Sequence, residues 1–591
     1  MQFDKLKLLN HPLNDFLIKK ELIKEEILKK QTSFVPIKIA IMAGSTVEEI
    51  VDNLELFLLA SGIKPTFYVT KFNDFFNESI TISKQLKDFK PDIVFYHTNW
   101  RNLFSLPKPS LSRDSIEKSL LDNQTRFLNM WENISQTFNC TIIQNNFDYC
   151  YFRVLGNMDS YDYHGINNFI ARMNIFLSEK AVTTRNLFIN DLNYLQAKYG
   201  INDFSDPKYW FLYKYAINVR FIPIFSFNLA NIIKSILGKN KKVINLDLDN
   251  TLWGGIIGDD GIEGIKISQG DPVGEYYQEF QHYLKSLKET GVLLTINSKN
   301  DSKNAHLGLS HPDSILLEND FVDIQSNWLP KNVNLSTTAK LLNLGIDSFV
   351  FVDDNPVERQ IIKDSFDCVD VIDYVDNAIY GIDFLSPFEC TFLSEDDFQR
   401  TNYYRNDLER KKSENSFLDY NDFLKSLDME SEIQYFKELY FDRITQLINK
   451  TNQFNLTTNR LTKEQVVSLS GDNASVCLFA KLKDKFGDNG LVSCIIGEKQ
   501  DEKTISITNW VMSCRVFSRG LENALMNEFV KEAIKLGYSK IVGTYAKTKK
   551  NSLVEHLYQN YGFIHSDLLP NVYEINVSDY SPKKHFIRIK R

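Results

Sequence analysis

Short apolar runs alternate along the first part of the chain with longer segments in which apolar positions recur at helical spacing. An apolar run over residues 35–46 precedes the helical pattern of residues 47–62, and further apolar runs cover residues 91–100 and 140–146. Regular alternation of strands with helices predicts a parallel sheet whose faces are covered by helices. We therefore expect a first α/β domain that closes near residue 235.

The same alternation begins again at residue 243. The pattern predicts strands that start at residues 243, 292 and 348, with helices over residues 273–291 and 337–345 between them. Each of these strands ends in a polar cluster. Ligands in open parallel sheets bind beyond the carboxyl ends of the strands, so these clusters are candidate site residues.

A charged connector, FLSEDDFQRTNYYRNDLERKKSENS, separates this second block from a third. The third block contains a strand and turn over residues 479–497 and a helical pattern over residues 521–537. We therefore predict an α/β chain of three domains, which cover residues 1–235, 236–395 and 396–591.

The composition limits the class of protein. The chain has 591 residues, 43% of them hydrophobic and 24% charged, with a net charge of −8, which gives no electrostatic reason to expect a nucleic-acid partner. We expect neither a signal peptide nor a membrane span, and the cytoplasm is the expected compartment. The seven cysteines include no CxxC pair, so we expect free thiols rather than disulfides or zinc ligands.

Two carboxylates stand two residues apart at the end of the strand VINLDLDNTLWGG. Side chains alternate between the faces of a strand, so Asp247 and Asp249 point the same way and need a positive charge between them. The pattern Asp247-x-Asp249-x-Thr251 resembles motif I of the haloacid dehalogenase (HAD) superfamily of phosphoryl-transfer enzymes. The resemblance implies that Asp247 is the nucleophile and Asp249 the general acid/base, with Mg²⁺ bound by both. Thr251 and Trp253 are then expected to contact the substrate.

Three later segments match the remaining HAD motifs in order. Ser298 matches motif II, where a hydroxyl holds the phosphoryl group, and Lys331 matches motif III, where an ammonium neutralises it. Asp353 and Asp354 match motif IV, and the resemblance makes both Mg²⁺ ligands, with Asp354 the more direct one. Taken singly, each residue also fits a helix cap, a solvated lysine or a solvated turn. The series of four favours an enzyme.

The motifs also resemble a narrower group, the FkbH-like family. The segments DLDNTLWGG, SKN, NWLPKN and VDDNPVER carry this resemblance, with residues 448–460, 484–493 and 513–525 further along the chain. It implies a HAD-like Rossmannoid domain fused to a GNAT-like α+β acyltransferase domain. Family members are associated with dephosphorylating 1,3-bisphosphoglycerate and loading glyceryl onto an acyl carrier protein, in polyketide or polysaccharide biosynthesis. Asn297, rather than cysteine, precedes Ser298, so no thioester is expected there.

The segment RVFSRG stands where a GNAT fold binds pyrophosphate. Arg515, Arg519 and Gly520 are therefore candidate contacts for coenzyme A or a carrier-bound phosphopantetheine, although both arginines also suit structural ion pairs. Cys514, beside Arg515, is a candidate acyl-carrying nucleophile, or alternatively a small core residue.

The segment KTNQFN offers several polar side chains within a few residues. Lys450, Asn452 and Gln453 are candidate contacts for a hydroxylated acyl group. An ordinary helix end followed by a loop uses the same residue types, so both interpretations stay open.

Gly44-Ser45, after the first strand, gives the N-terminal block a faint resemblance to SGNH-type hydrolases. The usual late acid and histidine are missing, and Asp162 and His164 are wrongly spaced, so we expect a non-catalytic domain for recognition or docking. The expected function is Mg²⁺-dependent phosphoryl transfer coupled to acyl transfer. Two alternatives remain: an acyl-CoA-dependent acyltransferase acting on a sugar or amine in surface polysaccharide biosynthesis, and a non-catalytic scaffold that binds carrier proteins.

Overall fold

The computed structural model describes residues 13–30, 34–184, 186–373, 377–414, 416–451, 453–548, 551–566 and 571–590. Contacts divide the chain into two compact units. The first unit extends to Lys234 and includes Thr462–Gln465, and the second contains Ser235–Leu461 and Val466–Arg591. The second and third predicted blocks therefore pack together within one unit.

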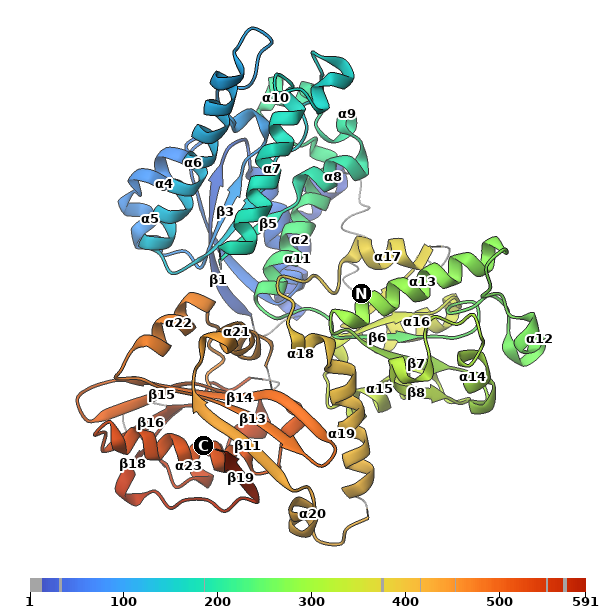
Figure 1. The fold of residues 1–591 in the computed structure, drawn as a ribbon, viewed down its shortest axis with the longest axis vertical. Helices are drawn as coiled ribbons and strands as arrows, with labels where there is room; N and C mark the ends of the chain where they lie inside the picture. Colours follow the sequence, from blue (N-terminus) through green and yellow to red (C-terminus); the bar gives the residue numbers. More distant parts are fainter. Residues whose placement is uncertain are drawn as a thin grey trace. The chain divides into compact units, whose positions relative to one another are not determined.

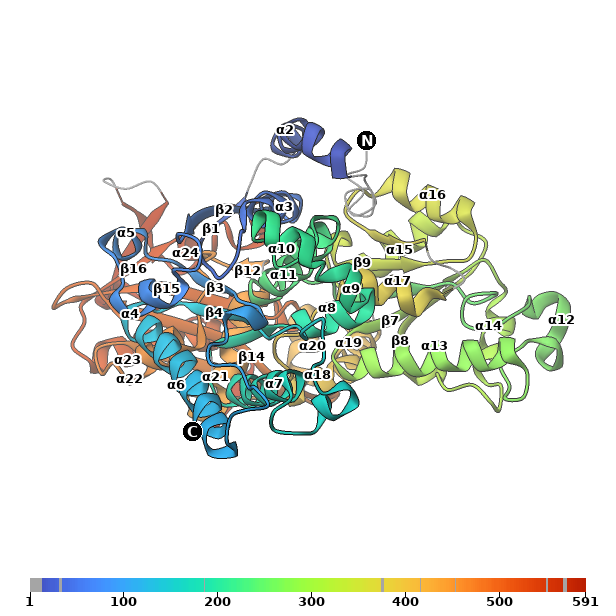
Figure 2. The ribbon, with the colours of Figure 1, turned by 90° about the horizontal axis from the view of Figure 1, so that it is seen from above.

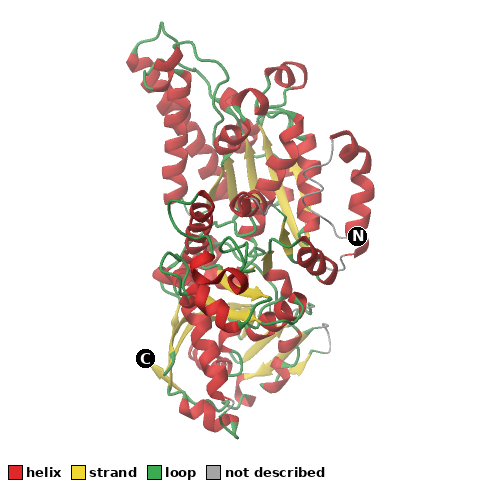
Figure 3. Ribbon diagram, turned by 90° about the vertical axis from the view of Figure 1, so that its right-hand side faces the viewer, coloured by secondary structure: helices red, strands yellow, loops and turns green. Residues whose placement is uncertain are grey.

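The first unit is built on a parallel five-stranded sheet of order β2-β1-β3-β4-β5. Its strands are β1 Val35–Ala43, β2 Ile63–Val69, β3 Ile93–His97, β4 Thr141–Asn145 and β5 Leu187–Asn190. The helices are α2 Leu13–Lys30, α3 Glu48–Ala60, α4 Phe75–Thr81, α5 Lys84–Phe89, α6 Arg113–Thr137, α7 Ile166–Thr183, α8 Leu192–Tyr199, α9 Ile201–Phe204, α10 Pro207–Tyr213 and α11 Ile222–Ile236. Figure 3 shows helices on both sides of these strands.

Residues 219–236 are long and apolar enough to cross a membrane by length and composition alone. In the structure 72% of this window is buried, and α11 packs its apolar face within the protein. Such burial is typical of a core helix.

The second unit contains a parallel sheet of order β10-β9-β6-β7-β8. Its strands are β6 Val243–Leu246, β7 Leu293–Ser298, β8 Phe321–Ser326, β9 Phe349–Val352 and β10 Asp370–Ile372. The helices are α12 Ile257–Gly264, α13 Pro272–Glu289, α14 Ser302–Leu309, α15 Lys331–Leu341, α16 Pro356–Ser365 and α17 Ala378–Leu385. In Figures 1 and 2, α15 and α16 cover one face of this sheet, and α13 and α17 the other.

The same unit contains a larger, mostly antiparallel sheet of order β17-β18-β16-β15-β14-β13-β11-β19, with β12 paired to β15. Its strands are β11 Met429–Tyr435, β12 Phe454–Asn455, β13 Val476–Asp484, β14 Gly487–Lys499, β15 Thr504–Met512, β16 Lys540–Thr544, β17 Ile564–His565, β18 Val572–Asn576 and β19 Ile587–Lys590. The helices are α20 Tyr420–Ser426, α21 Phe441–Lys450, α22 Lys463–Gly471, α23 Leu521–Lys535 and α24 Leu557–Asn560. Trp510 and Phe529 are fully buried in its core.

The charged connector folds as two helices, α18 Glu395–Phe398 and α19 Arg400–Glu414. One face of α19 is buried at helical spacing, through Thr401, Tyr404, Asp407 and Arg410. Tyr404 belongs to the core of the parallel sheet, whereas Arg410 binds Asp484 at the end of β13. Helix α19 therefore joins the two sheets of this unit by burying one face, as its position in Figure 1 shows.

Candidate active site

Three carboxylates meet at the carboxyl edge of the parallel sheet in the second unit. Asp247 directly follows β6, and Asp353 and Asp354 directly follow β9, which is hydrogen-bonded beside β6. The chain order reverses between these two strands, and open sheets bind ligands at such a point. One oxygen from each of the three carboxylates lies within 4.8 Å of the others.

Lys331 supplies the positive charge that this group requires. It is the first residue of α15, is 2% exposed, and its Nζ lies 3.0 Å from Asp247 Oδ2 and 2.5 Å from Asp353 Oδ2. Burial by itself lowers the pKa of Lys331, but the carboxylates of Asp247 and Asp353 raise that pKa above its usual value. The ammonium therefore stays charged inside the site.

A buried amide holds the backbone of Lys331 in place. Asn297 Nδ2 donates to the carbonyl oxygen of Lys331 at 2.9 Å and to Asn245 Oδ1 at 3.1 Å. Asn334, on α15, donates in turn to Asn297 Oδ1. The sequence analysis noted Asn297 only because no cysteine stands at that position, and it did not predict this structural role. The sequence contained a signal for this role, because Asn245 and Asn297 stand inside two apolar strands and buried amides require hydrogen-bond partners.

The three carboxylates fit a hard divalent cation. Asp247 Oδ1 is buried without a hydrogen-bond partner. Burial, followed by repulsion from Asp247, raises the pKa of both Asp353 and Asp354, so the cluster is short of positive charge even with Lys331 present. Carboxylate oxygens are the protein ligands that Mg²⁺ prefers. Asp247, Asp353 and Asp354 are thus the residues that would hold the metal.

Asp249 lies outside this group of three, although the sequence placed it among the metal ligands. Its Oδ1 accepts hydrogen bonds from Trp253 Nε1 at 2.9 Å and from the backbone N–H of Ile257 at 3.1 Å, and Asn300 Nδ2 donates to its Oδ2 at 3.0 Å. Burial raises the pKa of Asp249. A carboxyl group that has a raised pKa and is oriented by three hydrogen-bond donors is suited to proton transfer.

The sequence predicted that Trp253 and Thr251 contact the substrate, and the structure shows what surrounds both side chains. Trp253 is fully buried and its indole N–H orients Asp249. Thr251 is 6% exposed, and its hydroxyl is buried without a partner. Ser298 ends β7, is 2% exposed, and lies at the same edge of the sheet as Asp247. Roles in substrate binding remain predictions for all three.

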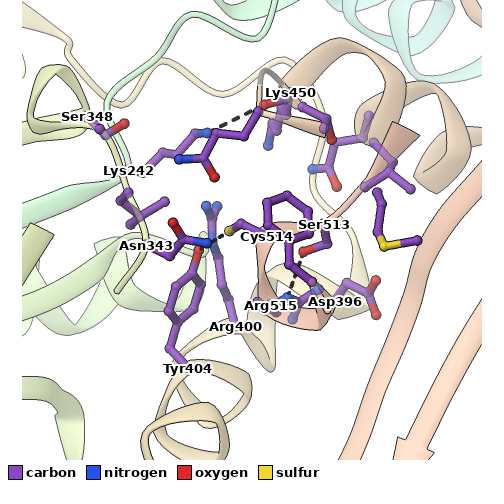
Figure 4. Close-up of a pocket in the computed structure, with 18 of the residues that line it drawn as sticks. Lys242, Asn343, Ser348, Asp396, Arg400, Tyr404, Lys450, Ser513, Cys514 and Arg515 are labelled. Carbon is purple, nitrogen blue, oxygen red and sulfur yellow. Dashed lines mark hydrogen bonds between the residues drawn. The ribbon is translucent and has the colours of Figure 1, made fainter. Parts of the chain in front are cut away.

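Cys514 lies on a cavity of about 340 Å³ within the same unit. It begins the short helix Cys514–Val516 after β15, and its sulfur lies 3.7 Å from the hydroxyl of Tyr404. Lys450, Gln453 and Arg515 also line this cavity, so four of the predicted C-terminal residues meet there. Figure 4 shows the thiol of Cys514 and the hydroxyl of Tyr404 pointing toward each other. Asn452 lies outside the described residues.

The structure places Arg519 in ion pairs, which is the alternative that the sequence left open. Its guanidinium is 6% exposed and contacts Asp407 at 2.5 Å and Asp484 at 3.4 Å. The ion pairs of Arg519 therefore connect α19 to the large sheet. Gly520 precedes α23 with a φ of +81°, and burial raises the pKa of Glu522 in the first turn of this helix. The carboxylate at the start of α23 is that of Glu522.

Ser45 in the first unit is 1% exposed, and its hydroxyl has no hydrogen-bond partner. His97 pairs with the amide of Asn145 at 3.1 Å, and burial lowers its pKa to about 3. Asp162 and His164 pair with each other at 2.8 Å. Within the described residues, no histidine forms a hydrogen bond with the hydroxyl of Ser45. The non-catalytic role of this unit remains a prediction.

Comparison with known proteins finds one matching family and similar solved structures. Residues 62–234 match the family described as "FkbH, N-terminal domain". No curated protein matches the chain. Among solved structures, the chain is similar to the N-terminal part of the protein BF1531 from Bacteroides fragilis, which contains a phosphatase domain complexed with Mg. The identity is 24% and the TM-score 0.58, over 64% of this chain and 99% of that one. The predicted α/β fold and FkbH resemblance are thus confirmed.

Shorter matches include several proteins named as acetyltransferases, among them SpeG from Vibrio cholerae, a spermidine/spermine N-acetyltransferase that is 16% identical over 26% of this chain and 96% of that one, with a TM-score of 0.20. Ard1 from Thermoplasma volcanium is 17% identical over 24% of this chain and 94% of that one, with a TM-score of 0.20. Rv2747 from Mycobacterium tuberculosis, in complex with CoA and NLQ, is 13% identical over 23% of this chain and 74% of that one, with a TM-score of 0.19. TM-scores this low give no support to any functional assignment of this chain.

Proposed function

We propose that the chain, whose residues 62–234 match the family described as "FkbH, N-terminal domain", is a Mg²⁺-dependent phosphoryl-transfer enzyme that also transfers a small acyl group. The observation that carries the proposal is the group of Asp247, Asp353 and Asp354 around the charged Lys331. Two buried carboxylates and one half-buried carboxylate beside a single ammonium retain negative charge, which suits a site that binds a cation and a phosphate together.

The roles of the residues follow from their contacts. Asp247 presents a carboxylate to phosphorus as the nucleophile, and Lys331, at 3.0 Å, offsets the charge that develops on the phosphoryl oxygens. Asp249, with its raised pKa, donates a proton to the leaving oxygen and then accepts one from the attacking water. A bound Mg²⁺ supplies charge neutralisation and Lewis acidity.

We propose a glyceryl phosphate of the 1,3-bisphosphoglycerate type as the donor, and the thiol of an acyl carrier protein as the acceptor. The FkbH-like motifs support this choice, and Cys514 at the wall of a cavity supports a thiol that holds the acyl group in transit. The first unit would then serve recognition or docking. An acyl-CoA donor has less support, because Arg519 is engaged by Asp407 and Asp484.

The test is a loading assay with the full chain. Purified protein is incubated with Mg²⁺, 1,3-bisphosphoglycerate and a phosphopantetheinylated carrier protein, and the carrier is then weighed by intact-protein mass spectrometry. We expect a glyceryl adduct on the carrier and release of phosphate. If phosphate is released and the carrier stays unmodified, the acyl-transfer half of the proposal is wrong. If no phosphate is released, the phosphoryl-transfer half is wrong.

A further inference from the structure

The carboxyl edge of the parallel sheet in the first unit carries a cluster of aromatic side chains. Trp100 follows β3, Tyr151 and Phe152 lie in the segment after β4, and Trp210 and Phe211 belong to α10. The rings of Trp100 and Phe152 lie 6.3 Å apart, and those of Tyr151 and Phe152 lie 5.0 Å apart. The chain order reverses between β1 and β3, and open sheets bind ligands outside such a point.

Helix α10 exposes apolar side chains although its position is fixed. Phe211, Leu212 and Tyr213 are each more than half exposed, and no residue of the helix is buried. The hydroxyl of Thr46, just after β1, donates to the carbonyl oxygen of Tyr213 at 2.7 Å, and the backbone N–H of Thr46 donates to that of Lys214 at 3.1 Å. A fixed helix that exposes consecutive apolar side chains is typical of an interaction surface.

Arg101 lies within the aromatic cluster. Its guanidinium carbon lies over the rings of Trp100 and Trp210, at 4.3 Å and 4.8 Å from their centroids. The rings of Tyr151 and Phe211 are 5.7 Å and 6.0 Å from the same carbon. Such contacts hold a guanidinium in place through its face, and its N–H groups point outward in the plane of the group.

The hydrogen-bonding capacity of Arg101 is unused by the protein. Within the parts of the chain that the structure describes, its guanidinium donates no hydrogen bond and has no carboxylate at ion-pair distance. Asp148, which acts on Arg101 electrostatically, is buried, and its oxygens accept from the backbone N–H of Trp100 at 3.0 Å and from the hydroxyl of Ser205 at 3.1 Å. Arg101 is therefore a preformed site for a carboxylate from outside the chain.

The charges around the cluster are mostly positive. Residues 98–104, 149–154 and 206–214, which form it, contain four cations and one acid. The cations are Arg101, Arg153, Lys208 and Lys214, and the acid, Asp206, caps α10 by accepting from the backbone N–H of Lys208. The whole chain, in contrast, has a net charge of −8. A positive surface on an acidic chain is complementary to a negatively charged partner.

We propose that this surface docks an acidic partner protein, one carboxylate of which binds Arg101 while its apolar side chains pack on Phe152 and Phe211. The inference rests on the proposed function for the identity of the partner, the carrier protein that accepts the acyl group, and adds the surface that recognises it. A small anion would leave the exposed apolar side chains of α10 uncovered. Arginine and large aromatic side chains together are typical of the residues that dominate binding between proteins.

Binding of a carrier protein to the full chain tests this surface. The probe is a fluorescently labelled, phosphopantetheinylated acyl carrier protein of net negative charge, and fluorescence anisotropy measures its Kd. We expect Arg101→Gln to raise the Kd about tenfold and Phe211→Ser to raise it severalfold. Because Phe211 is exposed, its replacement leaves the fold intact and tests the surface even if Arg101→Gln does not fold.

The matched control is Lys64→Gln. It removes a positive charge from an exposed position near the start of β2, at the opposite edge of the same sheet, and should bind the carrier like the wild type. Raising the ionic strength should also weaken binding of the wild type more than binding of Arg101→Gln, because the variant lacks the ion pair.

Three results would overturn the proposal. The first is no binding of the carrier by the wild type, and the second is an equal Kd for the wild type, Arg101→Gln and Phe211→Ser. The third is a wild type that forms a dimer in analytical ultracentrifugation while Phe211→Ser is a monomer, because a second copy would then cover this surface.

The binding measurement requires no turnover at Asp247. A chain that binds the carrier through this surface but releases no phosphate contradicts the phosphoryl-transfer half of the proposed function and supports the docking surface. A chain that loads the carrier while Arg101→Gln and Phe211→Ser bind it like the wild type rejects the docking surface and leaves the proposed function standing.

Discussion

Lys242 and Asp247 lie at opposite ends of one strand, β6, and belong to different sites. Lys242 precedes the strand and lines the cavity of Cys514, whereas Asp247 follows it and carries the proposed phosphoryl-transfer centre. Four extended residues lie between them, and the five steps from Lys242 to Asp247 correspond to about 16 Å along the strand. Acyl transfer to Cys514 therefore takes place away from Asp247 and needs an acyl phosphate that is still intact, because the carboxylate released by attack at the acyl phosphorus cannot acylate a thiol.

Replacing Asp247 and replacing Asp249 should have opposite effects on the amount of covalent phosphoenzyme. Asp247→Asn removes the nucleophile, so turnover should fall by several orders of magnitude and no phosphoenzyme should form. Asp249→Asn retains the nucleophile but removes the proton acceptor for water, so the phosphoenzyme should accumulate with an acyl phosphate. Acid quench followed by mass spectrometry measures both. Near-normal turnover of Asp247→Asn would show that the motif has another role.

Magnesium should stabilise the protein most at neutral and higher pH. The pKa values of Asp353 and Asp354 are raised in the folded state, so without metal their favourable contribution is complete below pH about 4 and is lost as pH rises through the folded pKa values. Mg²⁺ binds the ionised form and should reverse that loss. Thermal unfolding with and without Mg²⁺ between pH 5 and 8 measures this, with Asp367→Asn as an exposed control. A Mg²⁺ effect that does not grow with pH would contradict it.

Trp253→Phe should shift the pH dependence of phosphoryl transfer. The indole N–H donates to Asp249 and lowers its pKa, so its loss should raise that pKa further and move the acid limb of the rate profile upward by about one unit or less. Trp328→Phe is the matched control, because Trp328 is 70% exposed and donates to Asp301. The two variants should differ in pH profile. Superimposable profiles would show that the indole does not tune Asp249.

Lys450→Met should stabilise the fold at neutral pH. Burial lowers the pKa of Lys450 from 10.5 to about 8, so folding is penalised below pH 8 and the penalty disappears as pH rises toward 10.5. Asp397, Arg400, Arg443 and Cys390 also act on this amine. We expect a gain of about 1 to 3 kcal/mol at pH 7 and less at pH 10. Denaturant unfolding at the two pH values measures it, and an equal gain at both would exclude the titration.

The order of the motifs along the chain was sufficient to predict that the carboxylates of Asp247 and Asp353 lie together, because each of them follows directly after an apolar strand. Asp247 and Asp353 follow adjacent strands, and the alternation of strands with helices already required a parallel sheet whose strand ends meet. Lys331 follows from its motif, although only the structure shows that it contacts both carboxylates. The same sequence reasoning assigned Asp249 to the metal, because alternation fixes the face of a side chain but not its hydrogen-bond partners.

The cavity of Cys514 was decided by tertiary structure. Its cations come from the start of β6, from α19, from α21 and from the segment after β15, and no spacing along the chain relates these segments. The sequence identified the connector only as charged, whereas in the structure α19 buries Tyr404 in one core and Arg410 against Asp484. Local pattern determines which residues form a helix or strand. Which buried charges become neighbours depends on long-range packing, because an ion pair or a cavity exists only once distant segments have met.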